Sequence, residues 1–412
     1  MISRFARLPA RFILNPRHTT GLPYPETLKP ILSEAASAVA TKEIASWPGY
    51  EPTPLIWLEP LAEQLGVEAL YLKDESERFG LKSFKALGGA YAVYRVLAEV
   101  VERAEGRRPT AAEIASGEYS DLTSKVTVTC ATDGNHGRSV AWGAKTFGCA
   151  CTIVVHQTVS DARADAIAAF GADVVRSRGN YDDSVREAAE AAAENDWIVV
   201  SDTSYPGYLD IPRDVMSGYS VMVGEALRQL AEAGKPPPTH VFVQGGVGGL
   251  AAAVTSKLWE RLGAACPKIV VVEPETAACL FVSAEAGSPT VFKGDLETIM
   301  AGLSCGEVSI LAWRILDPGA AGFMTVSDAA AAEAMRLMAS GDAGHPVVCG
   351  ESGVAGLAGL LCLADHKDWR DAIGLGEAAR VLLIGSEGDT DPDAYFRIVG
   401  ATSEDVARRA EG

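Results

Sequence analysis

Short runs of apolar residues with little polar alternation recur along the chain, separated by longer stretches in which apolar positions follow helical spacing. Such runs are typical of parallel strands that are buried on both faces. We expect central strands at residues 151–155, 172–175, 197–200, 241–243, 269–272 and 381–384, and further strands at 69–73 and 125–129.

The segments between these strands divide into helices and loops. Alanine-rich stretches such as 161–170 and 184–193 are predicted to be helices, and the polar stretches 106–123 and 234–238 are predicted to be loops. Since strands and helices alternate, the pattern predicts an α/β protein whose parallel sheets carry helices on both faces.

Composition narrows the class of protein. The chain has 412 residues, 48% of them hydrophobic and 22% charged, which is long enough for two domains. No apolar run is long enough to cross a bilayer, so we expect a soluble protein that does not bind membranes. The net charge of −18 argues against nucleic acid and anionic membrane surfaces as partners.

The eight cysteines are scattered and show no metal-like pairing, which favours a reducing cytoplasm and predicts no metal site. Cys279 and Cys305 could bridge across a loop, but free thiols are the preferred interpretation.

The first residues are basic, because Arg4, Arg7, Arg11 and Arg17 precede the first acidic residue, Glu26. This bias is shared with organellar transit segments, but we favour a basic tail or a strand laid on the body of the protein.

Lys85 is the first candidate for chemistry. It stands in Ser83-Phe84-Lys85-Ala86-Leu87-Gly88-Gly89, a polar entry to a helix of small residues that follows the strand expected at 69–73. Apolar neighbours would desolvate the ammonium and favour the neutral amine, whose lone pair can attack a carbonyl and form a Schiff base. The alternative is a surface lysine in the first turn of a helix.

Two glycine-containing turns support a ligand site. The turn Asp133-Gly134-Asn135-His136-Gly137 lies between an expected strand and an expected helix, where side chains and backbone amides face a ligand. The second turn carries four glycines in five residues, which lets the backbone approach a phosphate closely. Its residues are Gly245, Gly246, Val247, Gly248 and Gly249.

The second turn also fits a dinucleotide-binding pattern. Gly246, Gly248 and Ala251 have the required spacing, and Glu273 ends the next strand near the position of a ribose-binding acid. A nicotinamide-dependent oxidoreductase is therefore the runner-up on local grounds, although it leaves Lys85 and the Asp133 turn unexplained.

Taken together, these motifs resemble the fold-type II pyridoxal-phosphate (PLP) enzymes, the group of tryptophan synthase β and threonine dehydratase. The chain is most similar to the diaminopropionate ammonia-lyases in residues 48–55, 73–81 and 387–392, and in having Asp133 where dehydratases usually carry serine. The resemblance extends from about residue 47 to residue 396.

The resemblance implies an architecture of two open, mostly parallel twisted sheets flanked by helices, as in tryptophan synthase β. It places a large cofactor-binding domain at residues 1–80 and 206–412 and a small domain at residues 81–205. It also implies a homodimer that binds a small amino-acid substrate.

The resemblance further assigns catalytic residues. Lys85 forms the Schiff base and takes the Cα proton on one face, and Asp133 serves as a base near the other face. Asp202 would bind the second amino group of the substrate. From the residues alone, Asp133 could instead cap a helix and Asp202 could cap a turn.

Cofactor contacts follow in the same way. Residues Gly245, Gly246, Val247, Gly248 and Gly249 would bind the phosphate, Asn135 the ring hydroxyl and Ser386 the pyridine nitrogen. Phe84 would pack beside the ring or belong to the core. His136, with no partner visible in the sequence, is interpreted as structural, and the loop 350–353 receives no role.

The expected reaction is the PLP-dependent α,β-elimination of 2,3-diaminopropionate, in either the D or the L form, to pyruvate and ammonia. A serine or threonine dehydratase of the same fold is the alternative enzyme. A PLP-binding protein without turnover is a further alternative, because a fold can outlast its chemistry.

Overall fold

The computed structural model describes residues 2–132, 134–179 and 181–410, and its contacts divide the chain into two compact units. Unit 1 comprises Met1–Glu34, Pro52–Glu77 and Met222–Gly412, and unit 2 comprises Ala35–Glu51 and Arg78–Val221. Each unit contains one of the two sheets. The domain boundaries expected from the resemblance, 1–80, 81–205 and 206–412, stay a prediction.

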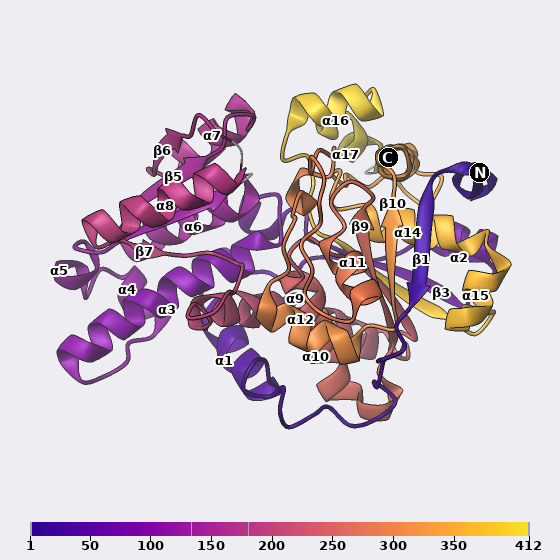
Figure 1. Ribbon diagram of the computed structural model, residues 1–412, viewed down its shortest axis with the longest axis horizontal. Coiled ribbons are helices and arrows are strands. Elements are labelled where there is room, and N and C mark those ends of the chain that lie inside the picture. Colours follow the sequence, from indigo (N-terminus) through magenta and orange to yellow (C-terminus); the bar gives the residue numbers. More distant parts are fainter. Residues whose placement is uncertain (1, 133, 180, 411–412) are drawn as a thin grey trace. The chain divides into compact units, whose positions relative to one another are not determined.

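The sheet of unit 1 has seven strands (Figure 1). The five inner strands run parallel, and the two edge strands run antiparallel to their neighbours. The order across the sheet is β1 (Ala10–Leu14), β10 (Gly322–Val326), β9 (Lys268–Pro274), β8 (His240–Gln244), β11 (Arg380–Gly385), β3 (Ala69–Asp74) and β2 (Leu55–Trp57).

Alternate side chains of these strands enter different layers. Phe242, Val270, Val272 and Met324 belong to a core that includes residues of α13 (Asp328–Ser340) and α14 (Ala355–Ala364). The intervening residues are equally buried, and α10 (Gly249–Leu262) and α11 (Cys279–Ala286) also pack on this sheet. Because both faces are covered, the inner strands are apolar throughout, as predicted.

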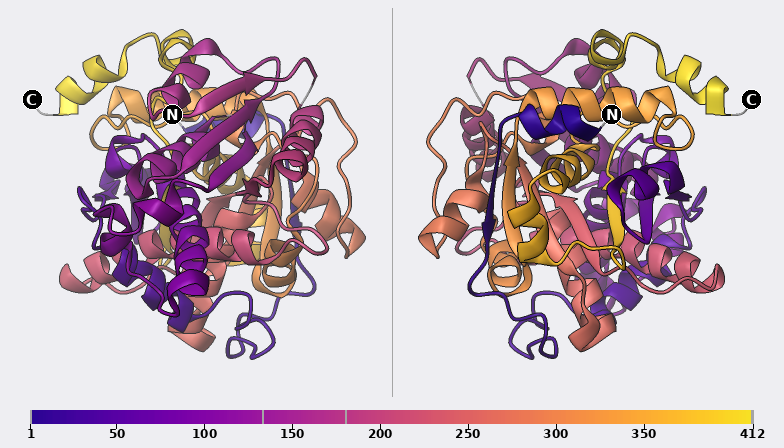
Figure 2. Two further views of the ribbon diagram at one scale, coloured as in Figure 1. Left: turned by 90° about the vertical axis from the view of Figure 1, so that its left-hand side faces the viewer. Right: turned by 90° about the vertical axis from the view of Figure 1, so that its right-hand side faces the viewer.

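The basic N-terminal segment forms part of unit 1. Strand β1 pairs with β10 as an edge strand, with Phe12 opposite Met324. It is the indigo arrow beside the orange strands in the right-hand view of Figure 2. Arg11 forms an ion pair with Glu285 at 2.7 Å, and Arg17 forms one with Asp317. The preferred interpretation, a strand laid on the body, is confirmed for residues 10–14.

The sheet of unit 2 has four parallel strands in the order β6 (Asp173–Arg176), β5 (Ala150–Val155), β4 (Thr127–Thr132) and β7 (Ile198–Val199). The predicted α/β class with two mostly parallel sheets is therefore confirmed. The expectation that 172–175 and 197–200 are central strands is wrong, since both lie at sheet edges and Val175 is 48% exposed. A short apolar run in the sequence does not show whether the strand lies at the centre or at the edge of a sheet.

Helices of unit 2 pack closely through small residues. In α3 (Lys85–Glu105) and α6 (Asn135–Phe147), a side chain on Gly89 would lie 2.5 Å from Ser139 Oγ, and one on Gly143 would lie 2.7 Å from Ala90 Cα. The first part of α9 (Asp210–Glu232) approaches α3 in the same way, because a Cβ on Gly218 would lie 2.0 Å from the Leu87 carbonyl oxygen.

The polar segment 106–123, predicted to be a loop, contains two short helices. Thr110 Oγ1 accepts a hydrogen bond from the Glu113 amide, and Glu113 Oε2 accepts one from the Thr110 amide at 2.7 Å. This reciprocal pair is a capping box, so the Thr-x-x-Glu spacing carried a helix signal that the composition of the segment obscured. The helices are α4 (Ala111–Ala115) and α5 (Ser120–Thr123).

The remaining helices lie at the periphery of the two sheets or connect their strands. Among the described helices, none has the length and apolar character that a membrane span requires. They are α1 (Glu34–Ile44), α2 (Glu59–Leu65), α7 (Asp161–Ala168), α8 (Tyr181–Asn195), α12 (Ile310–Gly319), α15 (Lys367–Ile373), α16 (Pro392–Val399) and α17 (Ser403–Ala410), with 3-10 helices η1 (Ile2–Arg7), η2 (Arg78–Gly80), η3 (Gly263–Ala265) and η4 (Ala301–Leu303).

Candidate functional site

Each sheet has a point at which the strand order reverses. In unit 2 the chain proceeds from β4 to β5 and β6 and then places β7 on the other side of β4; in unit 1 it proceeds from β8 to β9 and β10 and then places β11 beyond β8. Open α/β sheets bind ligands beyond the carboxyl ends of strands at such points. Most of the predicted site residues follow β4, β7, β8 and β11, and they form one cluster in each unit; Phe84 and Lys85 instead stand at the start of α3.

Within unit 2, Lys85 is paired with Asp202. Lys85 is the first residue of α3, and its Nζ lies 2.5 Å from Asp202 Oδ2. The two side chains are only 18% and 15% exposed. The ring centres of Phe84 and Tyr219 lie 5.5 and 5.7 Å from the same nitrogen. The ammonium is therefore partly withdrawn from water, as expected, and a carboxylate compensates its charge.

Asp202 is a buried carboxylate whose charge is held by its neighbours. Burial by itself would raise its pKa, but the Lys85 ammonium holds the pKa well below its ordinary range. Asp202 follows β7, and Lys85 begins a helix from a different part of the chain. The structure thus brings two predicted catalytic residues into contact and gives the cluster one ionised acid beside one amine.

His136 lies in the same cluster. Its Nε2 is 2.7 Å from the Val200 carbonyl oxygen, which only accepts hydrogen bonds, so Nε2 carries the proton. Burial lowers the pKa of His136, opposed in part by Asp202, and the ring is neutral near pH 7. Its Nδ1 lies 3.9 Å from Asp202 Oδ2 and is buried without a hydrogen-bond partner among the described residues.

The turn before α6 is held by the side chain of Thr132. Thr132 Oγ1 accepts hydrogen bonds from the Gly134 and Gly137 amides, both at 3.0 Å, and Gly134 has a φ of +143°. Asn135 begins α6 and is partly exposed. The predicted base Asp133 lies outside the described residues.

Within unit 1, the glycine turn joins β8 to α10. Gly246 and Gly248 have φ values of +59° and +100°, which only glycine adopts without strain. A Cβ on Gly248 would lie 3.1 Å from Ala312 Cβ and 3.2 Å from a methyl of Leu316. In the part of the chain that the structure describes, the Gly246 and Val247 amides donate to no backbone acceptor. Free amides at the N-terminus of a helix suit the phosphate of PLP.

Glu273 does not occupy the position of a ribose-binding acid. Its carboxylate is fully buried and accepts the amides of Leu280 and Phe281 at 2.9 and 2.7 Å, at the start of α11. Burial, opposed in part by these hydrogen bonds, raises the pKa of Glu273 to about 8. A carboxyl group engaged in this way cannot also bind two sugar hydroxyls. Glu273 therefore cannot be the ribose-binding acid that the nicotinamide-dependent alternative requires.

Ser386 follows β11, the strand beside β8, and is buried. Gln244, the residue before the glycine turn, donates from Nε2 to the carbonyl oxygens of Gly353 at 2.8 Å and Ile384 at 2.6 Å. The amide of Ser352 donates to Glu387 Oε1 at 2.9 Å. The loop 350–353 is thereby attached to the segment that carries Ser386.

Three residues of these clusters were missed in the sequence. Gln244 left a signal, because a polar residue that ends a buried apolar strand needs hydrogen-bond partners. Tyr219 left none that a local pattern reveals, because it is a core position of a long helix. Glu387 begins the segment 387–392 that carries the resemblance, but the sequence assigns it no role.

The eight cysteines all lie in the described residues, and none of them forms a disulfide bond there. Cys279 Sγ lies 3.4 Å from the Gly246 carbonyl oxygen, and Cys305 Sγ would lie 3.8 Å from a Cβ on Gly246. Both thiols therefore lie beside the glycine turn.

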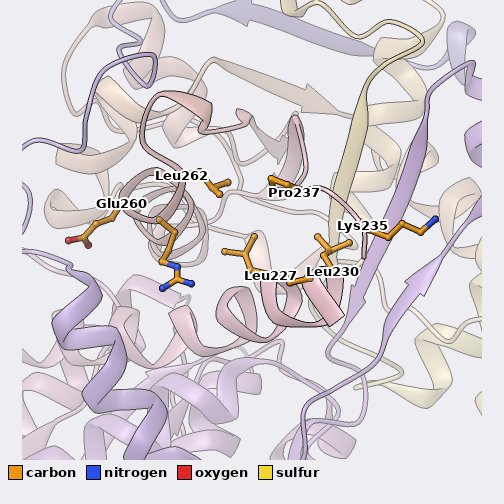
Figure 3. Close-up of a pocket in the computed structure, with 8 residues that line it drawn as sticks. Leu227, Leu230, Lys235, Pro237, Glu260 and Leu262 are labelled. Atoms are coloured by element: carbon orange, nitrogen blue, oxygen red, sulfur yellow. The ribbon is translucent and has the colours of Figure 1, made fainter. Parts of the chain in front are cut away.

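A surface pocket of about 350 Å³ lies elsewhere in unit 1 (Figure 3). It contains no predicted site residue and none of the residues in the two clusters. Its lining is Leu227, Leu230, Ala231, Lys235, Pro237, Glu260, Arg261 and Leu262.

Comparisons with known proteins identify the family of the chain. Residues 46–387 match the family described as pyridoxal-phosphate dependent enzyme. The diaminopropionate ammonia-lyase of Salmonella typhimurium is 40% identical over 85% of this chain and 89% of its own. The L-threonine dehydratase of Haemophilus influenzae is 29% identical over 64% of this chain and 44% of its own.

Solved structures of diaminopropionate ammonia-lyase are also similar to this chain. Holo diaminopropionate ammonia-lyase from Escherichia coli superposes with a TM-score of 0.87 at 34% identity, covering 95% of this chain and 97% of that one. The same enzyme has been solved with D-serine and with an aminoacrylate-PLP azomethine reaction intermediate, with TM-scores of 0.87 and 0.85 and the same identity and coverage.

Proposed function

Since the chain belongs to the diaminopropionate ammonia-lyases, within the pyridoxal-phosphate dependent enzymes, we propose that it converts 2,3-diaminopropionate of either hand and one water into pyruvate and two ammonia molecules. The observation that carries the proposal is the contact between Lys85 and Asp202. A lysine able to bind an aldehyde and a buried carboxylate able to bind an amine are both needed for a substrate with two amino groups.

The cofactor is PLP, and the residues of both clusters suit it. Lys85 would attach the aldehyde carbon covalently, and the glycine turn from Gly245 to Gly249, Val247 included, would bind the phosphate. Asn135 would hydrogen-bond the ring hydroxyl, Ser386 would meet the pyridine nitrogen, and Phe84 would pack beside the ring. When bound, PLP acts as an electron sink that makes the Cα proton of an amino acid acidic.

The protein supplies the proton transfers. The amine of Lys85 would take the Cα proton from one face of the substrate, and Asp133 would take it from the other. Asp202 would hold the second amino group as an ammonium, because an amine leaves readily only when it is protonated. Its low pKa supports this role, since the carboxylate stays ionised at neutral pH.

Replacing Asp133 by Asn tests the two-face assignment. The variant should lose roughly 10²- to 10⁴-fold in kcat/KM on the D isomer, the usual effect of removing a general base, and much less on the L isomer. Steady-state kinetics with each pure isomer measure the effect. Equal losses on both isomers would refute the assignment.

A substrate panel with pyruvate detection tests the activity. We expect 2,3-diaminopropionate to be the best substrate, ahead of D-serine, L-serine and L-threonine. Faster turnover of serine or threonine would make the protein a dehydratase of the same fold.

The attachment site can be tested separately. Borohydride reduction and peptide mass spectrometry should find the pyridoxyl group on Lys85. The Lys85→Ala variant should carry no such group, whereas the exposed-site control Lys367→Ala should retain it on Lys85. A pyridoxyl group on another lysine would sink the assignment.

The homodimer and the cytoplasmic location remain part of the proposal. Eight cysteines without a disulfide bond among the described residues support a reducing compartment. Light scattering on the purified protein decides the number of subunits.

A further inference from the structure

Two hydrogen-bond acceptors face each other in the cluster of unit 2. Asp202 is an ionised carboxylate, and His136 is neutral with its proton on Nε2, so the 3.9 Å between Oδ2 and Nδ1 separates two lone pairs. A buried acceptor without a donor destabilises the folded protein, and this free-energy penalty is usually larger than the net stabilisation that one hydrogen bond gives. Since His136 is only 7% exposed, the arrangement calls for a donor that reaches both atoms.

In this structure the ammonium of Lys85 serves Asp202. Asp202 also accepts a hydrogen bond from Thr203 Oγ1 at 3.4 Å. His136 Nδ1 is thus the acceptor that no described group serves, and a donor for it would come from the ligand.

We propose that His136 Nδ1 and Asp202 together form the receptor for the β-ammonium of the substrate, so that His136 is a specificity-determining residue for an amine over a hydroxyl. The inference rests on the proposed function. An ammonium has three donors and can serve both acceptors at once, whereas the hydroxyl of serine has one donor and leaves one acceptor unserved.

No proton passes to the histidine in this scheme. The electron pair that the departing proton leaves at Cα forms the Cα=Cβ bond, the Cβ–N bond breaks with its electron pair going to nitrogen, and the β-ammonium leaves as neutral ammonia. The Asp202 carboxylate and the neutral His136 keep their protonation states. His136 therefore acts by accepting a hydrogen bond from the ammonium.

A purely structural histidine would need only its Nε2–H, which serves the Val200 carbonyl oxygen. His136→Gln can keep that hydrogen bond through its side-chain amide while losing the acceptor at the position of Nδ1. His136→Asn is the reciprocal variant, since its shorter amide can replace Nδ1 but cannot reach Val200.

The test compares kcat/KM for 2,3-diaminopropionate and D-serine in the three proteins. Loss of a hydrogen bond to a charged group should lower the ratio of the two values by about ten- to a hundredfold in His136→Gln. His136→Asn should keep more of the preference for the amine and lose more thermal stability. Equal losses on the two substrates in His136→Gln would overturn the inference.

A second measurement does not depend on activity. The ¹⁵N shifts of the imidazole in labelled holoenzyme should show an unprotonated Nδ1, and addition of 2,3-diaminopropionate to a catalytically blocked, borohydride-reduced protein should shift that nitrogen. A protonated Nδ1 overturns the inference. Wild-type protein that makes no pyruvate from 2,3-diaminopropionate would refute the proposed function, whereas an unchanged preference in His136→Gln refutes only the role of His136.

Discussion

Burial and ion pairing act in opposite directions on the acids of this protein. Asp202 is buried beside an ammonium, which outweighs the cost of burial and keeps it charged. Glu273 is buried beside two backbone amides, which do not outweigh that cost, so its pKa is raised. Neither outcome follows from residue type, because both depend on what lies within about 4 Å of the carboxyl group.

The raised pKa of Glu273 has a consequence for stability. The folded protein keeps a proton on Glu273 that the unfolded chain releases, so this group's contribution is fully present at acid pH and is lost as pH rises from about 4.5 towards about 8. Glu273→Gln cannot ionise, and it keeps an acceptor oxygen for one of the two amides, since Leu280 and Phe281 donate to different oxygens of Glu273; the loss of the other hydrogen bond does not depend on pH. It should therefore gain stability relative to wild type through this range, by at most about 1.4 kcal/mol per pH unit.

Urea unfolding at pH 5, 7 and 8.5 measures this difference. The values at pH 5 serve as the internal control, because both side chains are then neutral in the folded state. A difference between the two proteins that does not change with pH would contradict the prediction.

At the scale of elements, the helices of unit 2 depend on the absence of side chains. The Gly88-Gly89 pair belongs to the small-residue helix that the sequence predicts, and the structure gives the reason for the glycines, because α6 and α9 contact this stretch of α3. Close approach brings Ser139 Oγ within 2.7 Å of the Lys85 carbonyl oxygen, to which it donates. Packing of small residues therefore positions the start of the helix that carries Lys85.

Gly143→Ala tests this dependence. The new methyl would lie 2.7 Å from Ala90 Cα, a backbone atom that cannot move aside, so we expect a loss of roughly 1–3 kcal/mol in unfolding free energy. Gly224→Ala in α9 is the matched control, because its methyl would meet only the flexible end of Lys257 at 3.5 Å.

The control variant should be neutral or gain up to about 1 kcal/mol from helix propensity. Thermal unfolding of both variants and of the wild type measures these differences in stability. A Gly143→Ala protein as stable as wild type would show that α3 and α6 can separate without cost.

At the scale of the whole molecule, both units combine segments that are distant in sequence: unit 1 is built from three and unit 2 from two. A ligand that binds only the folded protein stabilises it by mass action, by about 2.7 kcal/mol at a hundred times its Kd. Removal of PLP should therefore lower the melting temperature, and its return should restore it.

Lys85→Ala provides the control for this prediction, because the variant retains the glycine turn but not the covalent link. Scanning fluorimetry should give a smaller shift with PLP in Lys85→Ala than in wild type. Equal shifts in the two proteins would place the main stabilising contact away from Lys85.

The sequence by itself determined the α/β class, the positions of most strands, the two glycine turns and the motif around Lys85, because each depends on local periodicity or on backbone conformations that few residues adopt. It also carried the family resemblance, since that resides in the same short motifs.

Only the tertiary structure decided which strands lie at edges, that Lys85 pairs with Asp202, that Glu273 caps a helix and that His136 presents a bare nitrogen to a carboxylate. These features join residues that are far apart in the sequence. Their partners depend on the path of the whole chain, and a local pattern holds no information about that path.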